Sequence, residues 1–354
     1  MHWELSEEHE MFATALRDWA TATFPPEVVR SLTAEGRTRE FTDALVSAGW
    51  WGVGYPEEAG GEGGGVLELA LAAREFGRAA VPDSSWLAAA LVAPLLTDEE
   101  LARQLAGEER FALALRADRA PSWTPLRLEG AALTGCVEHV LGAQDADVLL
   151  VPVRGERGDG VARVASGSIQ VEPDDLLDRS RRTASVRFDG VEPADVAPAD
   201  PGVMVRVSSL AAALTAADSL GAAERMLELS VEYSKQREQF GQPIGAFQAV
   251  KHACAQMLVT VEAAYSISLY AAAAVEAGLD EAPTVAAVAK AQVTETVAAL
   301  ADSALTVHGA IGYTWEHDLH LFYKRAKFNR SVYGSARVWN ERIAAVLLGP
   351  AAAA

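Results

Sequence analysis

Apolar residues recur near helical spacing at the start of the chain, at Leu5, Met11, Phe12, Leu16 and Trp19. Ser6, which two glutamates follow, predicts the N-cap and first turn of this helix. The same spacing predicts helices over residues 41–49 and 66–80, and the glycine-rich stretch 60–65 predicts a loop between them. The first part of the chain is therefore expected to be a helical domain, residues 1–108.

The pattern changes to short apolar runs over residues 111–115, 132–140, 148–153 and 185–188. Gly, Asp and Pro separate these runs, which predicts a small β domain, 109–203, with a hairpin or exposed loop over 154–160. Long apolar-striped helices follow over 208–236, 247–276, 284–307 and 336–348, which indicates an antiparallel four-helix bundle, 204–354. The predicted fold class is α+β, mostly α, with a β-barrel-like domain between two helical ones.

The composition is that of a soluble globular protein, because 50% of the 354 residues are hydrophobic and 22% are charged. From the sequence, no apolar run is expected to approach the ~18 residues needed to cross a bilayer, and the acidic N-terminus does not resemble a signal peptide, so no membrane association is expected. Two widely separated cysteines, Cys136 and Cys254, fit a reducing compartment and predict a cytoplasmic location.

Charge is distributed unevenly along the chain, whose formal net charge is −19. Residues 205–354 hold all five lysines, seven arginines and 14 acidic residues, a net of −2, which leaves −17 for the residues before them. So acidic a chain is a poor partner for nucleic acid. Two explanations of this uneven charge remain open. Either the acidic residues only form a solvated surface, or the C-terminal part is near neutral because it accepts an anionic ligand or partner.

Two stretches carry the most specific residue patterns. Residues 233–248 read YSKQREQFGQPIGAFQ and combine a helix end, a Gly/Pro turn and the next helix start. Residues 308–318 read HGAIGYTWEHD, a small-residue turn whose backbone N–H groups can approach a ligand closely. With GVGYPEEAGG at 52–61 and AKA at 289–291, the chain closely resembles the acyl-CoA dehydrogenase family of flavoproteins over nearly its whole length.

The resemblance implies FAD-linked α,β-desaturation of an acyl-CoA substrate, with electron-transfer flavoprotein as the electron acceptor. It also implies that this chain contacts the FAD diphosphate and adenosine of a neighbouring subunit through Arg237, Gln239, Phe240, Gln248, Gly309, Ala310 and Gly312. A guanidinium suits a diphosphate because it donates two hydrogen bonds in a fixed plane. In the structural alternative Arg237 pairs with a carboxylate at a helix end and Phe240 belongs to the core.

Several family features are missing from this sequence. The Thr-Glu-Pro, Gly-Ser-Asp and Trp-Ile-Thr-Asn segments that hold the flavin ring in the family have no match in 111–121 or 139–147. Gly334 and Ala211 stand at the two positions where the family places its catalytic glutamate, so the base is unassigned. Asp218 is a weak substitute, on the face of Ala211 but about 10 Å further along the helix. The spacing of His, Cys and acidic residues predicts no metal site.

These departures leave three hypotheses open. The leading one is a base-less acyl-CoA dehydrogenase subunit that completes the FAD site of a second, dissimilar subunit. The second is a self-sufficient homo-oligomer with an atypical base. The third is a cofactor-free assembly protein that keeps only the fold.

Overall fold

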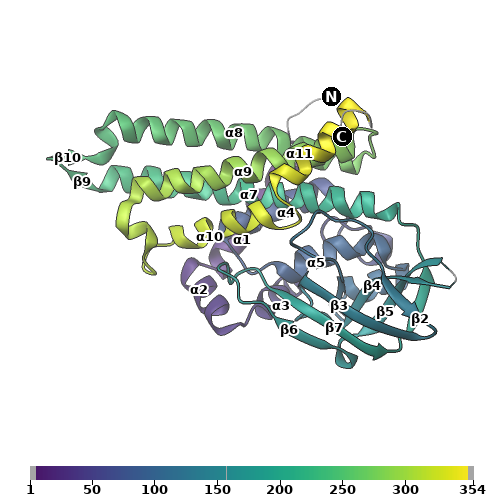
Figure 1. Cartoon of the computed structure of the whole chain (residues 1–354). Coiled ribbons are helices and arrows are strands. Elements are labelled where there is room, and N and C mark those ends of the chain that lie inside the picture. The colour runs from purple at the N-terminus through teal and green to yellow at the C-terminus, as the bar shows by residue number, and fades with distance from the viewer. Residues whose placement is uncertain (1–4, 157, 350–354) are drawn as a thin grey trace.

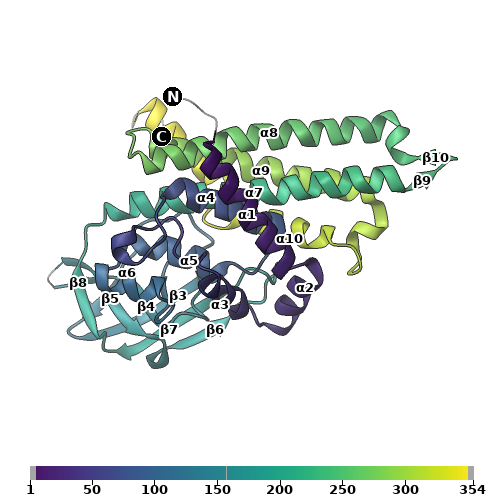
Figure 2. The ribbon, with the colours of Figure 1, turned by 180° about the vertical axis from the view of Figure 1, so that it is seen from behind.

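The computed structural model describes residues 5–156 and 158–349. Helices of the N-terminal part pack along one side of a long helical bundle, the side on which the sheet lies (Figures 1 and 2). They are α1 (Glu7–Thr23), α2 (Pro26–Glu35), α3 (Arg39–Ser47), α4 (Val66–Ala79), α5 (Ser84–Val92) and α6 (Asp98–Leu105). As predicted, Ser6 caps α1. Its hydroxyl accepts a hydrogen bond from the His9 backbone N–H, and the His9 ring accepts one from the Ser6 backbone N–H. The glycine-rich stretch before α4 is a loop.

The middle of the chain forms a sheet whose strands run in the order β6-β7-β3-β2-β4-β5-β8, with β1 paired to β4. The strands are β1 (Phe111–Leu113), β2 (Leu126–Glu129), β3 (Ala132–Leu141), β4 (Val148–Gly155), β5 (Gly158–Ala165), β6 (Gln170–Pro173), β7 (Thr183–Val191) and β8 (Asp195–Pro198). Strands β4 and β5 form the hairpin expected near 154–160. The apolar runs predicted β1, β3, β4 and β7, whereas β2, β6 and β8 contain no buried residue and give no such run.

The C-terminal part consists of long helices that lie side by side (Figure 1). They are α7 (Val203–Gln236), α8 (Gln248–Glu276), α9 (Ala282–His308), α10 (Leu319–Ser331) and α11 (Ala336–Leu348). A two-stranded hairpin, β9 (Glu238–Gln239) and β10 (Gln242–Pro243), joins α7 to α8. The sequence pattern missed α10, whose basic and aromatic residues interrupt the apolar stripe. The predicted fold class, α+β and mostly α, is confirmed.

Helices α4 and α7 cross in very close contact, which joins the N-terminal helices to the bundle. A Cβ added at Gly77 on α4 would lie 2.0 Å from the carbonyl oxygen of Asp218, and one at Gly221 on α7 would lie 1.8 Å from that of Arg74. No side chain fits at either position, so the two glycines set the distance between the helices. This crossing fixes α7, on which one of the expected base positions lies.

Helices α7 and α8 are long and apolar enough to cross a membrane by length and composition alone, contrary to the expectation from sequence. In α7, however, 83% of the most apolar window is buried inside the protein, and in α8 the share is 44%. The core helix of a soluble protein meets the same criterion, so these helices are weak evidence for a membrane span. The apolar character of α7 is explained by its central place in the core.

Candidate functional site

The far end of the bundle carries the hairpin in which Arg237, Gln239 and Phe240 lie. The Arg237 N–H donates to the Tyr233 carbonyl at 2.8 Å and ends α7, while the Ile244 N–H donates back to the Arg237 carbonyl at 2.8 Å. Gln239 pairs with Gln242 across the two strands. The side chains of all three predicted residues are exposed. The hairpin therefore presents them to whatever lies beyond the end of the bundle.

Phe240 has an unusual backbone conformation and an unusual environment. Its φ is +53°, and that of Gly241 is +80°, as the two-residue turn of a tight hairpin requires. A bulky residue is strained at positive φ. Its side chain is nevertheless 92% exposed, with one edge-on contact to Phe247 at 6.0 Å between ring centroids. Because the core does not explain this aromatic ring, the alternative in which Phe240 is a core residue is wrong.

The second predicted segment lies at the same end of the bundle, in the short helix η5 (Gly309–Tyr313) that follows α9 (Figures 1 and 2). The His308 ring stacks on the Tyr233 ring at 4.8 Å and connects the end of α9 to the last turn of α7. Gly309 (φ +64°, ψ −144°) needs glycine, and a Cβ at Gly312 would lie 2.8 Å from Leu305. The structure thus brings the two sequence motifs together.

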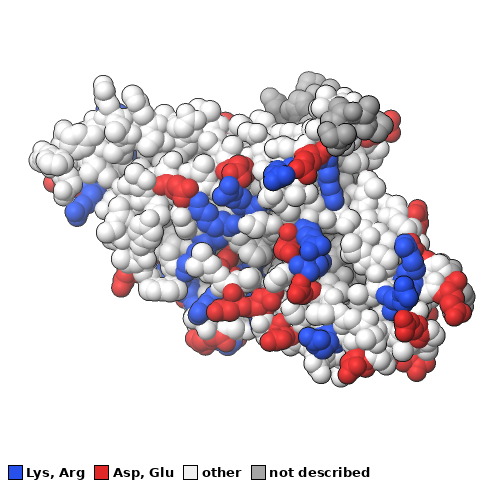
Figure 3. All heavy atoms as spheres, viewed as in Figure 1, with Lys and Arg blue, Asp and Glu red and all other residues white. Residues whose placement is uncertain are grey.

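Arg237 has no carboxylate within 4.0 Å among the described residues, so the alternative in which it forms an ion pair at the helix end finds no support. Other arginines in this acidic protein do have such partners, for example Arg225 with Glu228 at 3.0 Å. Figure 3 shows few charged side chains at this end of the bundle. Gln248 and Ala310 are exposed there as well. An exposed guanidinium and an exposed aromatic ring at one hairpin can together bind an aromatic phosphate ester.

The first expected base position, Gly334, has no room for a side chain. Its φ is +97°, and an added Cβ would lie 2.9 Å from the backbone nitrogen of Ala120. The neighbouring Tyr333 is buried, and its N–H donates to the Ala117 carbonyl at 2.5 Å. The loop after β1 therefore closes directly over the turn, and a glutamate at this position would require both a new backbone conformation and a displaced loop.

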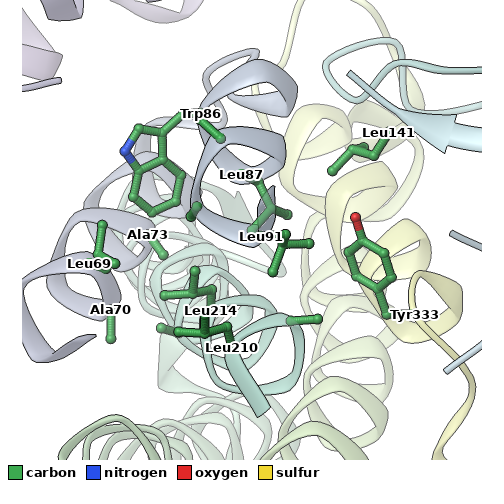
Figure 4. Packing of buried hydrophobic residues seen from close by; sticks show 14 of the residues in the cluster. Leu69, Ala70, Ala73, Trp86, Leu87, Leu91, Leu141, Leu210, Leu214 and Tyr333 are labelled. Atoms are coloured by element: carbon green, nitrogen blue, oxygen red, sulfur yellow. The ribbon is translucent and has the colours of Figure 1, made fainter. Parts of the chain in front are cut away.

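The second expected base position, Ala211 on α7, is 0% exposed. Around it, side chains from α5, α7 and the turn at Tyr333 form one hydrophobic cluster. Figure 4 shows Leu87 and Leu91 of α5 facing Leu210 and Leu214 of α7, with Tyr333 and Leu141 beside them. Ala211 thus lies within a packed hydrophobic core.

Asp218, the weak base candidate, belongs to a buried ionic cluster made of Asp83, Asp218, Arg181 and Arg325. Arg325 Nη2 lies 2.7 Å from both carboxylates, and Arg181 lies 2.8 Å from each. Asp218 is 1% exposed and also accepts a hydrogen bond from the Asn329 amide at 2.5 Å. Burial by itself raises the pKa of Asp218, but the two guanidinium groups outweigh it and hold the pKa below its ordinary value. The geometry gives Asp218 a structural role.

Lys290 of α9 holds the turn that contains Gly334 through hydrogen bonds. This side chain is 0% exposed, and its Nζ donates to the carbonyls of Asn329 and Gly334, both at 3.0 Å. Trp339 Nε1 donates to the Tyr333 carbonyl at 2.9 Å. Burial lowers the pKa of Lys290 to about 7. The turn is held by its backbone carbonyls, and this arrangement does not depend on a side chain at Gly334.

Sequence reasoning missed every member of the ionic cluster except Asp218. Asp83 precedes α5, Arg181 precedes β7 and Arg325 lies in α10, and none of them belongs to a periodic pattern. It also did not single out Tyr233 as the link between the two motifs. The available signal for Tyr233 was its place one helical turn before Arg237, opposite a histidine that ends α9.

Comparison with known proteins places the chain in a family. The model of the acyl-CoA dehydrogenase N-terminal domain matches residues 6–102, and that of the acyl-CoA dehydrogenase C-terminal domain matches residues 203–348. The chain therefore belongs to the acyl-CoA dehydrogenase family, as its motifs predicted. It is 36% identical to acyl-CoA dehydrogenase IpdE2 of Mycobacterium tuberculosis over 287 residues, which cover 80% of this chain and 78% of the relative.

Solved structures extend this likeness to the whole chain. A chain of the ChsE4-ChsE5 complex from Mycobacterium tuberculosis matches with a TM-score of 0.84 and 26% identity, over 99% of both chains. A variant of the Tcur3481-Tcur3483 steroid ACAD matches with a TM-score of 0.85 and 27% identity, over 99% of this chain and 100% of the other.

Proposed function

We propose that the chain is a subunit of a hetero-oligomeric acyl-CoA dehydrogenase and completes the FAD site of a second subunit, which supplies the catalytic base. The observation that carries this proposal is the closed turn at Gly334, where a Cβ would already collide with the Ala120 backbone. Ala211, at the second base position, is buried in the hydrophobic core. A chain with no carboxylate at either base position needs a partner that has one.

The far end of the bundle supports the other half of the proposal. Arg237 would hold the FAD diphosphate, Phe240 would cover an adenosine ring, and the turn at Gly309 would let backbone N–H groups come close. When bound, FAD supplies the hydride acceptor for α,β-desaturation of the acyl-CoA. The residues present fit the phosphate and adenosine end of the cofactor, since they are exposed, and Arg237 has no carboxylate partner among the described residues.

The face of α8 supports a partner subunit of the same family. The helix carries only Lys251, Glu262 and Glu276 as residues with a full charge, and Leu258 and Val259 are 48% and 61% exposed. Figure 3 shows that the surface along the top of the bundle is almost free of charge. This face continues to the hairpin, so a helix bundle packed against it would bring its cofactor to Arg237. Like the ChsE4-ChsE5 complex, the assembly would contain two different subunits.

The steroid ACAD among the similar structures supports an acyl-CoA with a steroid-derived or other bulky apolar acyl group as the substrate. Electron-transfer flavoprotein is the electron acceptor that we propose. Neither assignment depends on residues of this chain, because the substrate cavity would lie in the partner.

Co-expression with a second acyl-CoA dehydrogenase from a neighbouring gene tests the proposal. We expect flavin absorbance in the complex, little flavin in the chain alone, and loss of flavin from the complex when Arg237 is replaced by Ala. The matched control is Arg337→Ala, because Arg337 is an exposed arginine on α11. A lone chain that holds stoichiometric FAD and desaturates acyl-CoA would refute the proposal and favour the self-sufficient homo-oligomer.

A further inference from the structure

A cavity of about 320 Å³ lies between the start of α7, the start of α9 and helix α11. Its volume is within the range of small-molecule sites. Most of the wall is apolar, with side chains from all three helices and from the loop after β1; these include Met204, Val205, Pro283, Trp339 and Ile343. Arg342 of α11 is the charged residue that lines it. The cavity is distinct from the exposed end of the bundle where Arg237 lies.

The Arg342 guanidinium is held in place by neutral groups. Nη1 donates to the Ser208 hydroxyl at 2.9 Å, and Nη2 donates to the Pro121 carbonyl at 3.1 Å. Its plane lies over the Trp339 ring, with the guanidinium carbon 4.9 Å from the ring centroid. Trp339 is itself fixed by its hydrogen bond to the Tyr333 carbonyl. These contacts orient the cation at the cavity wall without neutralising its charge.

Arg342 differs from the other half-buried arginines because no carboxylate lies within 4.0 Å of it among the described residues. Arg163 pairs with Glu100 at 2.8 Å, and Arg17 pairs with Glu75 at 2.8 Å. Burial lowers the pKa of Arg342, and no neighbouring acid acts in the opposite direction. In a chain with 49 acidic and 30 basic residues, an uncompensated cation in an apolar cavity is unexpected.

We propose that this cavity binds an apolar monocarboxylate, whose carboxylate pairs with Arg342 and whose hydrocarbon body lies against Trp339 and the start of α7. A guanidinium that is already oriented and partly desolvated binds a carboxylate through two parallel hydrogen bonds. The hydroxyls of Ser208 and Ser209, which also line the cavity, add polar contacts near the charge. A neutral ligand of the same shape would leave the cation uncompensated.

Isothermal titration of the purified protein, with its partner subunit if one copurifies, tests this site. The probes are octanoate and adamantane-1-carboxylate, which distinguish a chain from a ring system, and each has its alcohol as the neutral counterpart. We expect at least one carboxylate to bind about 10-fold or more tightly than its alcohol, because only the carboxylate forms charge-assisted hydrogen bonds with the guanidinium. Equal affinity for acid and alcohol, or no binding of either acid, would overturn the proposal.

Variants locate the binding within the cavity. Arg342→Gln keeps a hydrogen-bonding side chain but removes the charge, and we expect it to abolish the preference for the acid. Arg337→Gln, on the same helix but exposed and paired with Glu341, should bind as the wild type does. Val205→Trp fills the cavity at a residue that is 54% exposed, and should weaken acid and alcohol alike. Wild-type acid preference in Arg342→Gln would contradict the assignment. None of these measurements needs flavin or turnover, so they are independent of the proposed function.

Discussion

Replacing Asp218 with Asn should destabilise the protein strongly. One carboxylate oxygen of Asp218 accepts from Arg325 Nε at 3.0 Å and from Asn329, and the other accepts from Arg325 Nη2 at 2.7 Å and lies 2.8 Å from Arg181 Nη2. Whichever way the new amide is turned, its NH₂ group would face donors. Removing one partner of a buried ion pair costs about 3–5 kcal/mol, and the apparent Tm should fall by ~6 °C or more.

Thermal and guanidinium unfolding followed by circular dichroism measure this effect, with Asp302→Asn as the matched control. Asp302 accepts from Lys327 Nζ at 2.8 Å, but its side chain is 59% exposed, so the control should lose at most ~1 kcal/mol. Flavin reduction by acyl-CoA is measured in parallel on the assembled complex. An Asp218→Asn protein with the wild-type Tm and no turnover would refute the structural role and restore Asp218 as the base.

The pH dependence gives the same experiment a second readout. Because the pKa of Asp218 is held below its ordinary value, the folded state binds fewer protons there than the unfolded state in acid. The stabilisation is complete above the ordinary carboxyl pKa and is lost as the pH falls through the lowered pKa. The difference in unfolding free energy between wild type and Asp218→Asn should therefore be constant near pH 7 and shrink below about pH 4.

Three further predictions follow from close contacts in the bundle. Gly334→Glu should lose ~2–4 kcal/mol through positive-φ strain and overpacking against Ala120, and should not desaturate acyl-CoA by itself; a stable, active variant would contradict the closed turn. Gly221→Ala, whose Cβ would lie 1.8 Å from a carbonyl of α4, should unfold at least ~3 kcal/mol more easily in denaturant than Gly167→Ala, where the space is open. The folded-state pKa of Lys290, about 7, lies below its unfolded value, so burial of the charged lysine destabilises the protein fully below pH 7 and less as the pH rises. Thermal scans should therefore show the wild type gaining stability relative to Lys290→Met between pH 7 and 9. A stability difference that does not depend on pH would refute this.

Periodicity was sufficient to predict the long helices α7, α8 and α9, because an apolar stripe of such length has few other interpretations. The two FAD motifs were recognisable because their small residues and turn chemistry are local. The closure of the turn at Gly334 was not predictable. It depends on contact with Ala120, which lies more than two hundred residues away in the sequence, and a missing glutamate alone does not reveal whether its space is empty or filled.

The ionic cluster escaped sequence analysis for a related reason. Asp83, Arg181 and Arg325 are each single charged residues with no local sequence pattern around them. Only the fold brings both guanidinium groups within 3 Å of the Asp83 carboxylate. Asp218 was noticed for its position relative to Ala211 on the same helix. That position predicts the face of α7 on which Asp218 lies. It does not predict that two guanidinium groups from other parts of the chain contact its carboxylate.

The same cluster determines how the chain can be divided. Asp83 belongs to the N-terminal helices, Arg181 to the sheet, and Arg325 and Asp218 to the bundle. The four charges sum to zero, and loss of either the N-terminal helices or the sheet unbalances them by one charge. A fragment that lacks the N-terminal helices or the sheet leaves a buried charge uncompensated, and one that lacks the bundle removes Asp218 and Arg325 from around the remaining Asp83–Arg181 pair. We therefore expect a single cooperative unfolding transition, and limited proteolysis to yield either the intact core or small peptides. Exchange of one domain between relatives should succeed only when the matching charges are exchanged with it.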